Sequence, residues 1–405
     1  MCEVRRCEVL PVLWQQLDEA EFGRPQWLFG WATWAFADER RMVATYARGA
    51  ARWTLATIDI GSGNDHRRAD GPGAARMAHG DAHARGLRCR ADPTTPATVA
   101  RTNLVDRRHE MLRSSSTLSL ERQHISIPEA IEFPTEGGLT AHAFYYPPSN
   151  ADVHRAPLRP SAAHRHQPRR ADDADHEAVL DLQVQFWTSR GFAVVDVNYG
   201  GSSGYGRAYR ERLELGVGHR GRGRQHQRGE VSGRAGEGRS RSADHPRRQR
   251  GRLHDARGAR RFIPRCSGAG ASYYGVSDVE ALAQDTHKFE SRYLDTTDRP
   301  VSGDARGSLR ERSPIHFIDR LSCALILFQG LEDKVVPPDQ SADDGRRGAR
   351  EGAASRVLAF EGEQHGFRRA ETIIRCLEAE LSFYGAVFRF TPAGALTPLT
   401  IENLA

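Results

Sequence analysis

The chain has 405 residues, of which 39% are hydrophobic and 27% are charged. This length allows two or three domains, each with a core of its own, and excludes a miniature scaffold. No apolar run approaches the ~20 residues that span a bilayer, which excludes a membrane-spanning protein. The N-terminal residues lack the continuous apolar segment that a secretory signal requires, so we expect a cytoplasmic protein without a membrane partner.

The net charge of +6 comes almost wholly from arginine, because only Lys288 and Lys334 among the 58 basic residues are lysines. Surfaces that bind phosphate or membranes usually mix both residue types, so this bias indicates a GC-rich coding sequence and no specific nucleic-acid partner. The six cysteines have neither paired nor metal-ligand spacing. We therefore expect no disulfide framework, no metal site and no cofactor.

The first part of the chain, residues 1–124, is predicted to be all-β. Apolar and aromatic segments separated by polar turns occur at 27–39, 41–49, 52–61 and, after a stretch without alternation at 64–96, at 97–104. A spacing of about ten residues between such segments is typical of antiparallel strands. Three or four strands cannot close a sandwich or a propeller alone, so a fragment of a larger β structure is expected.

From residue 125 the pattern changes to a mixture of strands and helices. The predicted elements are a hairpin at Ile125–Asn150, a helix from Leu180, a buried strand at Phe192–Val197, a Gly-rich loop up to Gly206, strands at Cys323–Gly330 and Arg356–Glu363, and a helix at Ala370–Phe388. A nearly continuous apolar strand is typical of a parallel sheet covered on both faces. We therefore predict an α/β domain over 125–390, followed by a tail at 391–405.

Two stretches interrupt this domain, at 153–177 and 216–265. Both are rich in arginine and histidine and have almost no large apolar side chains. Such composition cannot bury enough surface to offset the entropy of ordering the chain. Both are predicted to be disordered or non-native.

Asp333 and His365 stand where an α/β sheet would use them. Asp333 follows the predicted strand Cys323–Gly330, and His365 follows the next strand. Ligands of open α/β sheets bind beyond the carboxyl ends of the strands, so both side chains are expected in one crevice. An acid followed by a histidine about 30 residues later is typical of the Ser, Asp, His order of α/β-hydrolases, in which the carboxylate orients the imidazole that deprotonates a nucleophile. The alternative is that Asp333 caps a turn and His365 is an ordinary loop residue.

The segments around these residues, together with 180–213 and most of 270–385, closely resemble the prolyl oligopeptidase family, in particular its acylaminoacyl peptidase and dipeptidyl aminopeptidase-like members. The motifs that carry the resemblance are LFQGLEDKVVPP and FEGEQHGF. The resemblance implies an α/β-hydrolase domain preceded by a β-propeller remnant, a serine peptidase activity on short peptides, and Asp333 and His365 as the catalytic acid and base.

Two family motifs are missing: the Gly-Gly-Ser-Ala-Gly-Gly-Tyr nucleophile elbow and the His-Gly-Gly-Pro oxyanion loop. When a family-like elbow is written in codons that end in G or C and read from each third base, it yields the sequence of Ala243–Ala256; the oxyanion loop likewise yields Arg165–Asp172. We hypothesise that both stretches are out-of-phase translations, with the nucleophile's codon split between Gln249 and Arg250. Resequencing the coding DNA without finding flanking insertions or deletions would refute this.

Ser202 is a weak candidate nucleophile, because Gly200–Gly204 matches G-x-S-x-G after a strand. The motif lies one strand too early for the family, and a Gly-rich loop satisfies it by composition alone. Ser267 and Ser272 have a weaker claim. The expected protein is thus a serine peptidase that lacks its nucleophile and is inactive as written. The alternative is a noncatalytic pseudoenzyme or unstable product that binds polyanions adventitiously through its Arg-rich stretch.

Overall fold

The computed structural model describes the chain in segments. They are residues 20–22, 32–47, 53–60, 65–67, 74–75, 79–80, 85–103, 108–135, 138–152, 163–166, 178–213, 269–281, 310, 313–320, 323–339, 345, 350, 352 and 354–404. Two compact units are present: a first that contains every described residue up to Leu213 and a second that contains every described residue from Ala269 onward. None of the helices in the described part of the chain combines the length and the hydropathy that crossing a membrane requires.

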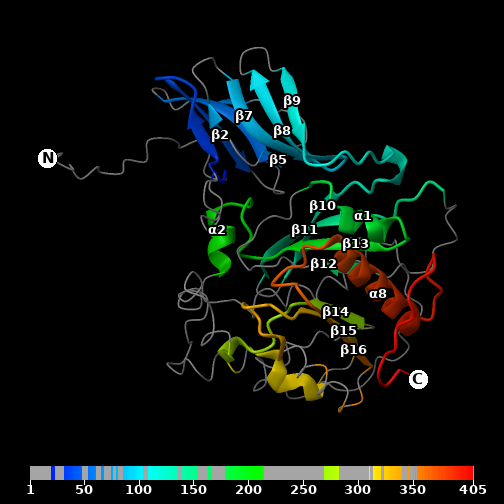
Figure 1. Cartoon of the computed structure of the whole chain (residues 1–405). Coiled ribbons are helices and arrows are strands. Elements are labelled where there is room, and N and C mark those ends of the chain that lie inside the picture. Colours follow the sequence, from blue (N-terminus) through cyan, green and yellow to red (C-terminus); the bar gives the residue numbers. More distant parts are fainter. Residues whose placement is uncertain are drawn as a thin grey trace. The chain divides into compact units, whose positions relative to one another are not determined.

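Two antiparallel sheets form the N-terminal part of the first unit (Figure 1). The first sheet has the order β1 (Trp34–Phe36), β2 (Arg41–Ala47), β3 (Trp53–Asp59) and β4 (Asp65–Arg67), and its core includes Ala37, Val43 and Leu55. The second joins β5 (Ala74–Ala75), β7 (Arg85–Asp92), β8 (Thr95–Asn103) and β9 (His109–Ser114), with β6 (His79–Gly80) also paired to β7. All described elements from Trp34 to Ser114 are strands, as the sequence predicts for this part of the chain. Neither set of described strands closes on itself, and a propeller is therefore not shown.

The stretch 64–96, which lacks alternation in the sequence, contains four of these strands, β4 to β7. Backbone N–H and C=O groups pair in a ladder whatever side chains they carry. Pairing with β3 and β8 therefore orders a segment that its own side-chain pattern does not identify.

A mixed sheet forms the rest of the first unit. Its order is β10 (Glu129–Pro134), β11 (Thr140–Tyr146), β13 (Ala193–Asn198) and β12 (Ala163–His166). The predicted hairpin is confirmed, but β13 pairs antiparallel with β11 and parallel only with β12, so this sheet is not purely parallel. β12 lies inside the stretch predicted to be non-native; the remainder of that stretch and the whole of 216–265 lie outside the described residues.

The helix α1 (Leu182–Thr188) packs against β13, and both its start and its buried face follow from the residues of the helix. Asp181 caps it by accepting hydrogen bonds from the backbone N–H groups of the next turn, and Val184 and Trp187 are buried. Gln185 is also buried and makes two hydrogen bonds to the backbone of Ser126, at 2.8 and 3.1 Å. Short helical turns at η1 (Arg122–His124), α2 (Arg207–Arg210) and η3 (Glu211–Leu213) complete the described helical segments of this unit.

The second unit contains a parallel sheet in the order β14 (Ala269–Tyr273), β15 (Ala324–Gly330) and β16 (Ser355–Phe360), with η5 (Pro314–Arg320) preceding β15 and α8 (Ala370–Phe388) packed on β14 and β15. Ile326 and Phe328 of β15 and Leu381 and Phe383 of α8 are almost fully buried. The strands at β15 and β16 and the helix at 370–388 confirm the sequence prediction; β14 was not predicted as a strand. The segment expected to be a tail pairs back onto the sheet, because Glu402 and Ser355 exchange two backbone hydrogen bonds.

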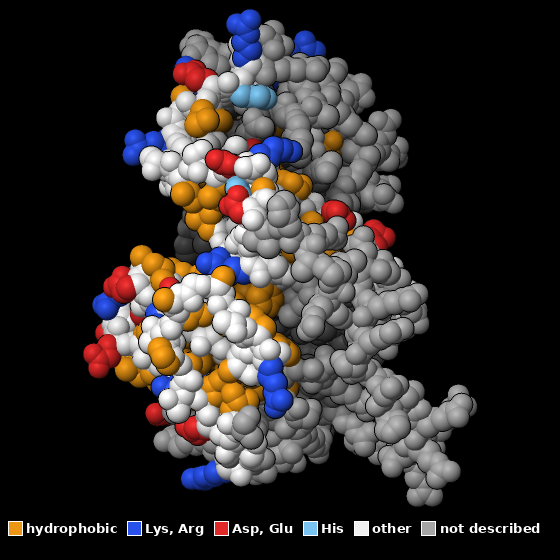
Figure 2. All heavy atoms as spheres, turned by 90° about the vertical axis from the view of Figure 1, so that its right-hand side faces the viewer, with side chains coloured by type: hydrophobic (Ala, Val, Ile, Leu, Met, Phe, Trp, Pro, Cys, Tyr) orange, Lys and Arg blue, Asp and Glu red, His pale blue; other side chains and the backbone are white. Residues whose placement is uncertain are grey.

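The described surface mixes charge and apolar groups. Figure 2 shows basic and acidic side chains interspersed on one face, with hydrophobic side chains visible between them. Scattered exposed apolar side chains are normal for a folded domain. Among the described residues on this face, no basic patch of the kind that binds nucleic acid is present.

Candidate active site

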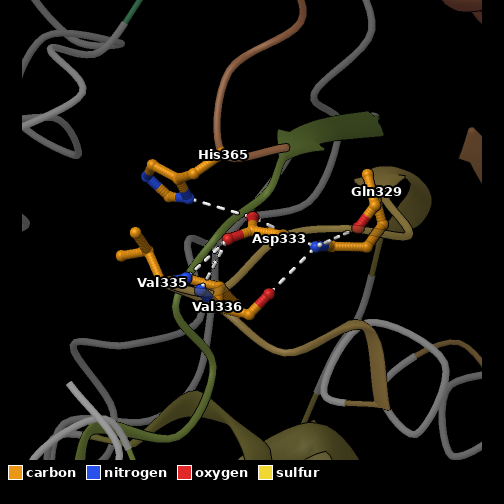
Figure 3. A network of polar contacts seen from close by, with 6 residues as sticks. Gln329, Asp333, Val335, Val336 and His365 are labelled. Carbon is orange, nitrogen blue, oxygen red and sulfur yellow. Dashed lines mark hydrogen bonds and ion pairs between the residues drawn. The ribbon is translucent and has the colours of Figure 1, made fainter. Parts of the chain in front are cut away.

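Asp333 lies in the loop that follows β15, with its side chain fully buried. One carboxylate oxygen, Oδ1, accepts hydrogen bonds from the backbone N–H groups of Val335 (2.8 Å) and Val336 (2.9 Å) (Figure 3). The other oxygen, Oδ2, accepts from the side-chain amide of Gln329 at 3.2 Å. The carboxylate is therefore held in one orientation by the backbone of its own loop and by Gln329 near the end of the strand β15.

Burial raises the pKa of Asp333, but the hydrogen bonds from His365 and from the backbone N–H groups outweigh it and lower the pKa below its ordinary value. The group is thus a carboxylate at neutral pH. A buried carboxylate that faces several donors keeps its charge without needing bulk water.

His365 lies in the loop that follows β16, and its Nδ1 is 3.0 Å from Oδ2 of Asp333. A carboxylate can only accept a hydrogen bond, so Nδ1 carries the proton and Nε2 of the neutral ring is left as the basic nitrogen. The side chain of His365 is 31% exposed, so the ring is open to a reactant while its partner is fully enclosed. Tyr274, immediately after β14, packs against the imidazole with ring centroids 4.9 Å apart.

The two loops are joined through their backbones. Leu331 donates to the carbonyl of Phe360, and Glu332 donates to the carbonyl of Glu363, both at 3.0 Å. This approach requires glycine at position 330, because a Cβ there would lie 2.5 Å from the carbonyl oxygen of Glu363. The close contact of the loops is what brings Asp333 within hydrogen-bond distance of His365.

Glu363 stabilises the loop that carries His365 by accepting hydrogen bonds from the backbone that follows it. Its side chain is almost fully buried and accepts hydrogen bonds from the backbone N–H groups of Arg368 (3.0 Å) and Arg369 (3.1 Å). These groups lie just before α8, where helix N–H groups lack partners within the helix. Glu363 therefore fixes both the start of the helix and the loop that carries His365.

A third buried carboxyl, Glu380, lies in α8, which packs on β14. Its two oxygens accept hydrogen bonds from the hydroxyl groups of Tyr273 (2.6 Å) and Tyr384 (2.8 Å). Burial raises the pKa of Glu380 to about 7, although the two tyrosine hydrogen bonds lower it in part. Among the described residues, the second unit thus contains two buried carboxyls whose pKa is lowered by hydrogen bonds, Asp333 and Glu363, and one, Glu380, whose pKa is raised by burial.

Ser202, the weak candidate nucleophile, belongs to the first unit, whereas Asp333 and His365 belong to the second. Its side chain is fully buried, and Oγ has no hydrogen-bond partner among the described residues. Its backbone N–H donates to the carbonyl of Tyr199 in a turn. These surroundings are those of a loop residue, not of a hydroxyl held by a general base.

The other serines of the sequence analysis give no better nucleophile. Ser272 lies within β14, where its Oγ occupies the space beside Gly275 that a Cβ would need. Ser267, and the positions Gln249 and Arg250 between which the nucleophile's codon was predicted to be split, lie outside the described residues.

Sequence reasoning missed several residues that support the pair. Gln329 ends an apolar strand with a buried polar side chain, a signal that could have identified it. Tyr274 adopts a positive φ of 41°, a conformation that the identity of this residue does not predict. In the described part of the chain, no group of three or more potential metal ligands is found.

Comparison with known proteins shows similarity to one family of peptidases. The model of the prolyl oligopeptidase family matches residues 178–221 and 264–391. A puromycin-hydrolyzing peptidase of Mycobacterium tuberculosis is 31% identical to this chain and has a TM-score of 0.81 over 95% of it; a solved puromycin hydrolase is 30% identical, with a TM-score of 0.80 over the same share. The acylaminoacyl peptidase of Pyrococcus horikoshii, 16% identical over 90% of this chain with a TM-score of 0.68, shares the fold.

The parallel sheet and the helix packed on it define the second unit as an α/β domain, with the buried Asp–His pair beyond the carboxyl ends of its strands. Residues 178–221 and 264–391 belong to the prolyl oligopeptidase family. The chain spans 57 to 58% of the length of these solved relatives. Among curated proteins, none matches the chain.

Proposed function

We propose that this chain carries the acid–base half of a serine peptidase of the prolyl oligopeptidase family and is inactive because its nucleophile elbow is absent. The observation that carries the proposal is the 3.0 Å contact between Nδ1 of His365 and Oδ2 of a fully buried Asp333. In serine peptidases such a carboxylate orients the imidazole and stabilises its protonated form during acyl transfer.

Each residue has a role in this chemistry. Asp333 is the acid that holds the tautomer of His365, and Nε2 of His365 is the base that takes a proton from an attacking hydroxyl and returns it to the leaving amine. The lowered pKa of Asp333 supports this role, because it keeps the carboxylate ionised at neutral pH, where it can accept the hydrogen bond from Nδ1 of His365. Tyr274 contacts the imidazole in a tilted arrangement and so limits its movement.

Short peptides are the proposed substrates of the intact enzyme. Two relatives are named for puromycin hydrolysis, and a mutant of one was solved in complex with PGG. Puromycin hydrolysis and the binding of PGG are properties of those proteins, and we extend the class of small peptide-like substrates to this chain as part of the proposal.

The missing nucleophile explains why the chain itself is expected to be inactive. Residues 243–256 and 165–172 would be the elbow and the oxyanion loop read in the wrong phase. Members of a triad act as a unit, and loss of one costs about 10⁴-fold to 10⁶-fold in turnover. Asp333 and His365 alone would then leave only slow chemistry with water.

The test is a re-phased chain in which these two stretches carry the family-like strings from which they were back-translated. It is expected to hydrolyse short chromogenic peptide amides, whereas the unaltered chain does not. Asp333→Asn in the re-phased chain should lower turnover about 10⁴-fold, because the amide holds the wrong tautomer of the imidazole. His365→Ala should abolish turnover, and Lys334→Ala, an exposed neighbour, is the matched control that should not.

Hydrolysis by the unaltered chain, or a re-phased chain whose activity survives both substitutions, would contradict the proposal. The polyanion-binding alternative depends on the stretch 216–265, which lies outside the described residues. No described feature favours it as a second function.

A further inference from the structure

Glu21 is a carboxylate buried inside the first unit, far in sequence from what it binds. Its exposed fraction is only 4%, and its backbone is anchored to the end of β2: Glu21 donates to the carbonyl of Ala47 at 2.8 Å, and Ala47 donates to the carbonyl of Glu21 at 2.9 Å. The residue thus extends the N-terminal antiparallel sheet. A charge this deeply buried requires compensating partners.

Both partners come from the loop and helix that follow β13. Oε2 of Glu21 accepts a hydrogen bond of 2.6 Å from the backbone N–H of Gly204, and Oε1 pairs with the guanidinium of Arg210 at the end of α2. These partners are 183 and 189 residues away along the chain. The contact therefore joins the N-terminal sheet to the mixed sheet of the same unit.

The loop is shaped to present these donors. Gly204 has a φ of 89°, a conformation that glycine adopts without strain, and it lies between the buried Ser203 and the ring of Tyr205. Tyr205 in turn is fixed by a 2.9 Å hydrogen bond from Asn198 and by stacking on His142 at 4.3 Å. A backbone N–H aimed at a carboxylate from such a rigid loop loses little entropy when it binds.

A second ion pair on the same helix provides a contrast. Arg207 and Glu211 of α2 and η3 also pair, but their side chains are 82% and 47% exposed. Exposed pairs four residues apart contribute little to stability. The pair formed by Glu21 and Arg210 differs because one partner is almost fully buried, so loss of either partner leaves an unmatched group.

We propose that the backbone N–H of Gly204 and the guanidinium of Arg210 form a carboxylate-binding site, which Glu21 occupies as an internal ligand that docks the N-terminal sheet onto the mixed sheet. The donor set is the one that carboxylates favour: an arginine fork together with a fixed amide. Arg210 is 40% exposed, so small anions from solvent can reach the site once the Glu21 side chain is gone. The proposal does not depend on peptidase activity.

The test is chemical rescue of Glu21→Ala by formate. The substitution is expected to lower the melting temperature of the first unit by about 5 °C, because Arg210 and Gly204 lose their partner. Sodium formate should restore most of this loss with a saturable dependence on concentration. Sodium chloride at equal ionic strength should not.

Three matched variants make the result specific. Glu21→Ala combined with Arg210→Gln should show no formate effect beyond that of chloride. Glu21→Gln, which fills the site without charge, should be destabilised but insensitive to formate. Glu211→Ala removes the exposed pair and should change the melting temperature by less than about 1 °C.

A second measurement covers the case in which Glu21→Ala does not fold. In Glu21→Gln, trypsin should cut after Arg210 at least about tenfold faster than in the unaltered chain, while cleavage after Arg122 keeps its rate. Equal cleavage rates at Arg210, an unchanged melting temperature in Glu21→Ala, or equal effects of formate and chloride would each overturn the proposal.

Discussion

The loop after β13 in the first unit and the loops after β15 and β16 in the second unit look alike in sequence, since each places polar side chains at the carboxyl end of a strand. Their surroundings differ. The first loop buries the hydroxyl of Ser202 without a described partner, whereas the other two bring Asp333 and His365 to 3.0 Å with both side chains oriented. A matching motif alone thus does not make a site, because chemistry requires groups that hold one another in place.

The loops also differ in which carboxylate accepts hydrogen bonds from their backbone N–H groups. The loop after β13 uses the N–H of Gly204 to bind Glu21, an interaction that joins two sheets. The loop after β15 uses its N–H groups to bind the carboxylate of Asp333, an interaction that orients a reactive pair. The first loop is therefore structural and the second is functional in this account.

The largest expected effect is that of Gly330→Ala, which would break the contact between the two loops of the second unit. The new methyl group would lie 2.5 Å from a backbone oxygen, so the loops must separate and the unit should lose about 3 kcal/mol of stability. Urea unfolding measures the loss, and the NMR signal of the His365 ring N–H reports the separation. Gly270→Ala is the control, because its Cβ would meet only Leu325 at 3.4 Å; an unfolding free energy that falls equally in both variants would contradict the close-approach argument.

Asp333→Ala should destabilise the second unit by about 2 kcal/mol, because the N–H groups of Val335 and Val336 lose their acceptor in a buried loop. Asp333→Asn keeps one oxygen for these groups and should cost about half as much. Since folding lowers the pKa of Asp333, its contribution is present above the ordinary value of 3.8 and is lost as the pH falls below it. Urea unfolding at neutral pH and in acid checks both statements, and equal losses in the two variants would show that the loop does not need this acceptor.

Glu380 should give the opposite pH dependence. Folding raises its pKa from 4.5 to about 7, so the stability contributed by the neutral carboxyl is complete below pH 4.5 and is lost as the pH rises through 7. The loss should be about 2 kcal/mol between pH 5 and 7, and Glu380→Gln should remove it. A melting temperature of Glu380→Gln that follows the same pH curve as the unaltered chain would show that this carboxyl is not the group that titrates.

Ser202→Ala is expected to have the smallest effect. Replacing a buried hydroxyl that lacks a described partner with a methyl group should change the stability by less than about 0.5 kcal/mol, and an increase is compatible with the account. Ser203→Ala, at the neighbouring buried hydroxyl, is the matched comparison. A loss of more than about 2 kcal/mol in Ser202→Ala alone would show that this hydroxyl has a partner that the comparison of the loops overlooks.

Long periodic segments are the part of the fold that the sequence predicts well. The helix at Ala370–Phe388 and the strands β15 and β16 follow from apolar periodicity, and the rule that ligands bind beyond strand ends brings Asp333 and His365 together. β14 is short and contains glycine and alanine, so its own pattern is weak, and its strand conformation depends on parallel pairing with β15.

Contacts between distant segments are the part that the sequence does not predict. The close approach at Gly330 depends on the path of another loop, and the binding of Glu21 to Gly204 joins residues 183 positions apart. Neither leaves a local pattern. The strand β12 likewise depends on pairing with β13 and not on its own residues.

Labelling with a fluorophosphonate, followed by mass spectrometry of the modified peptide, tests the central claim most directly. The account predicts that no serine of the unaltered chain is modified, and that the re-phased chain is modified at the serine of the restored elbow only while His365 is intact. A fluorophosphonate adduct on Ser202 of the unaltered chain would contradict it.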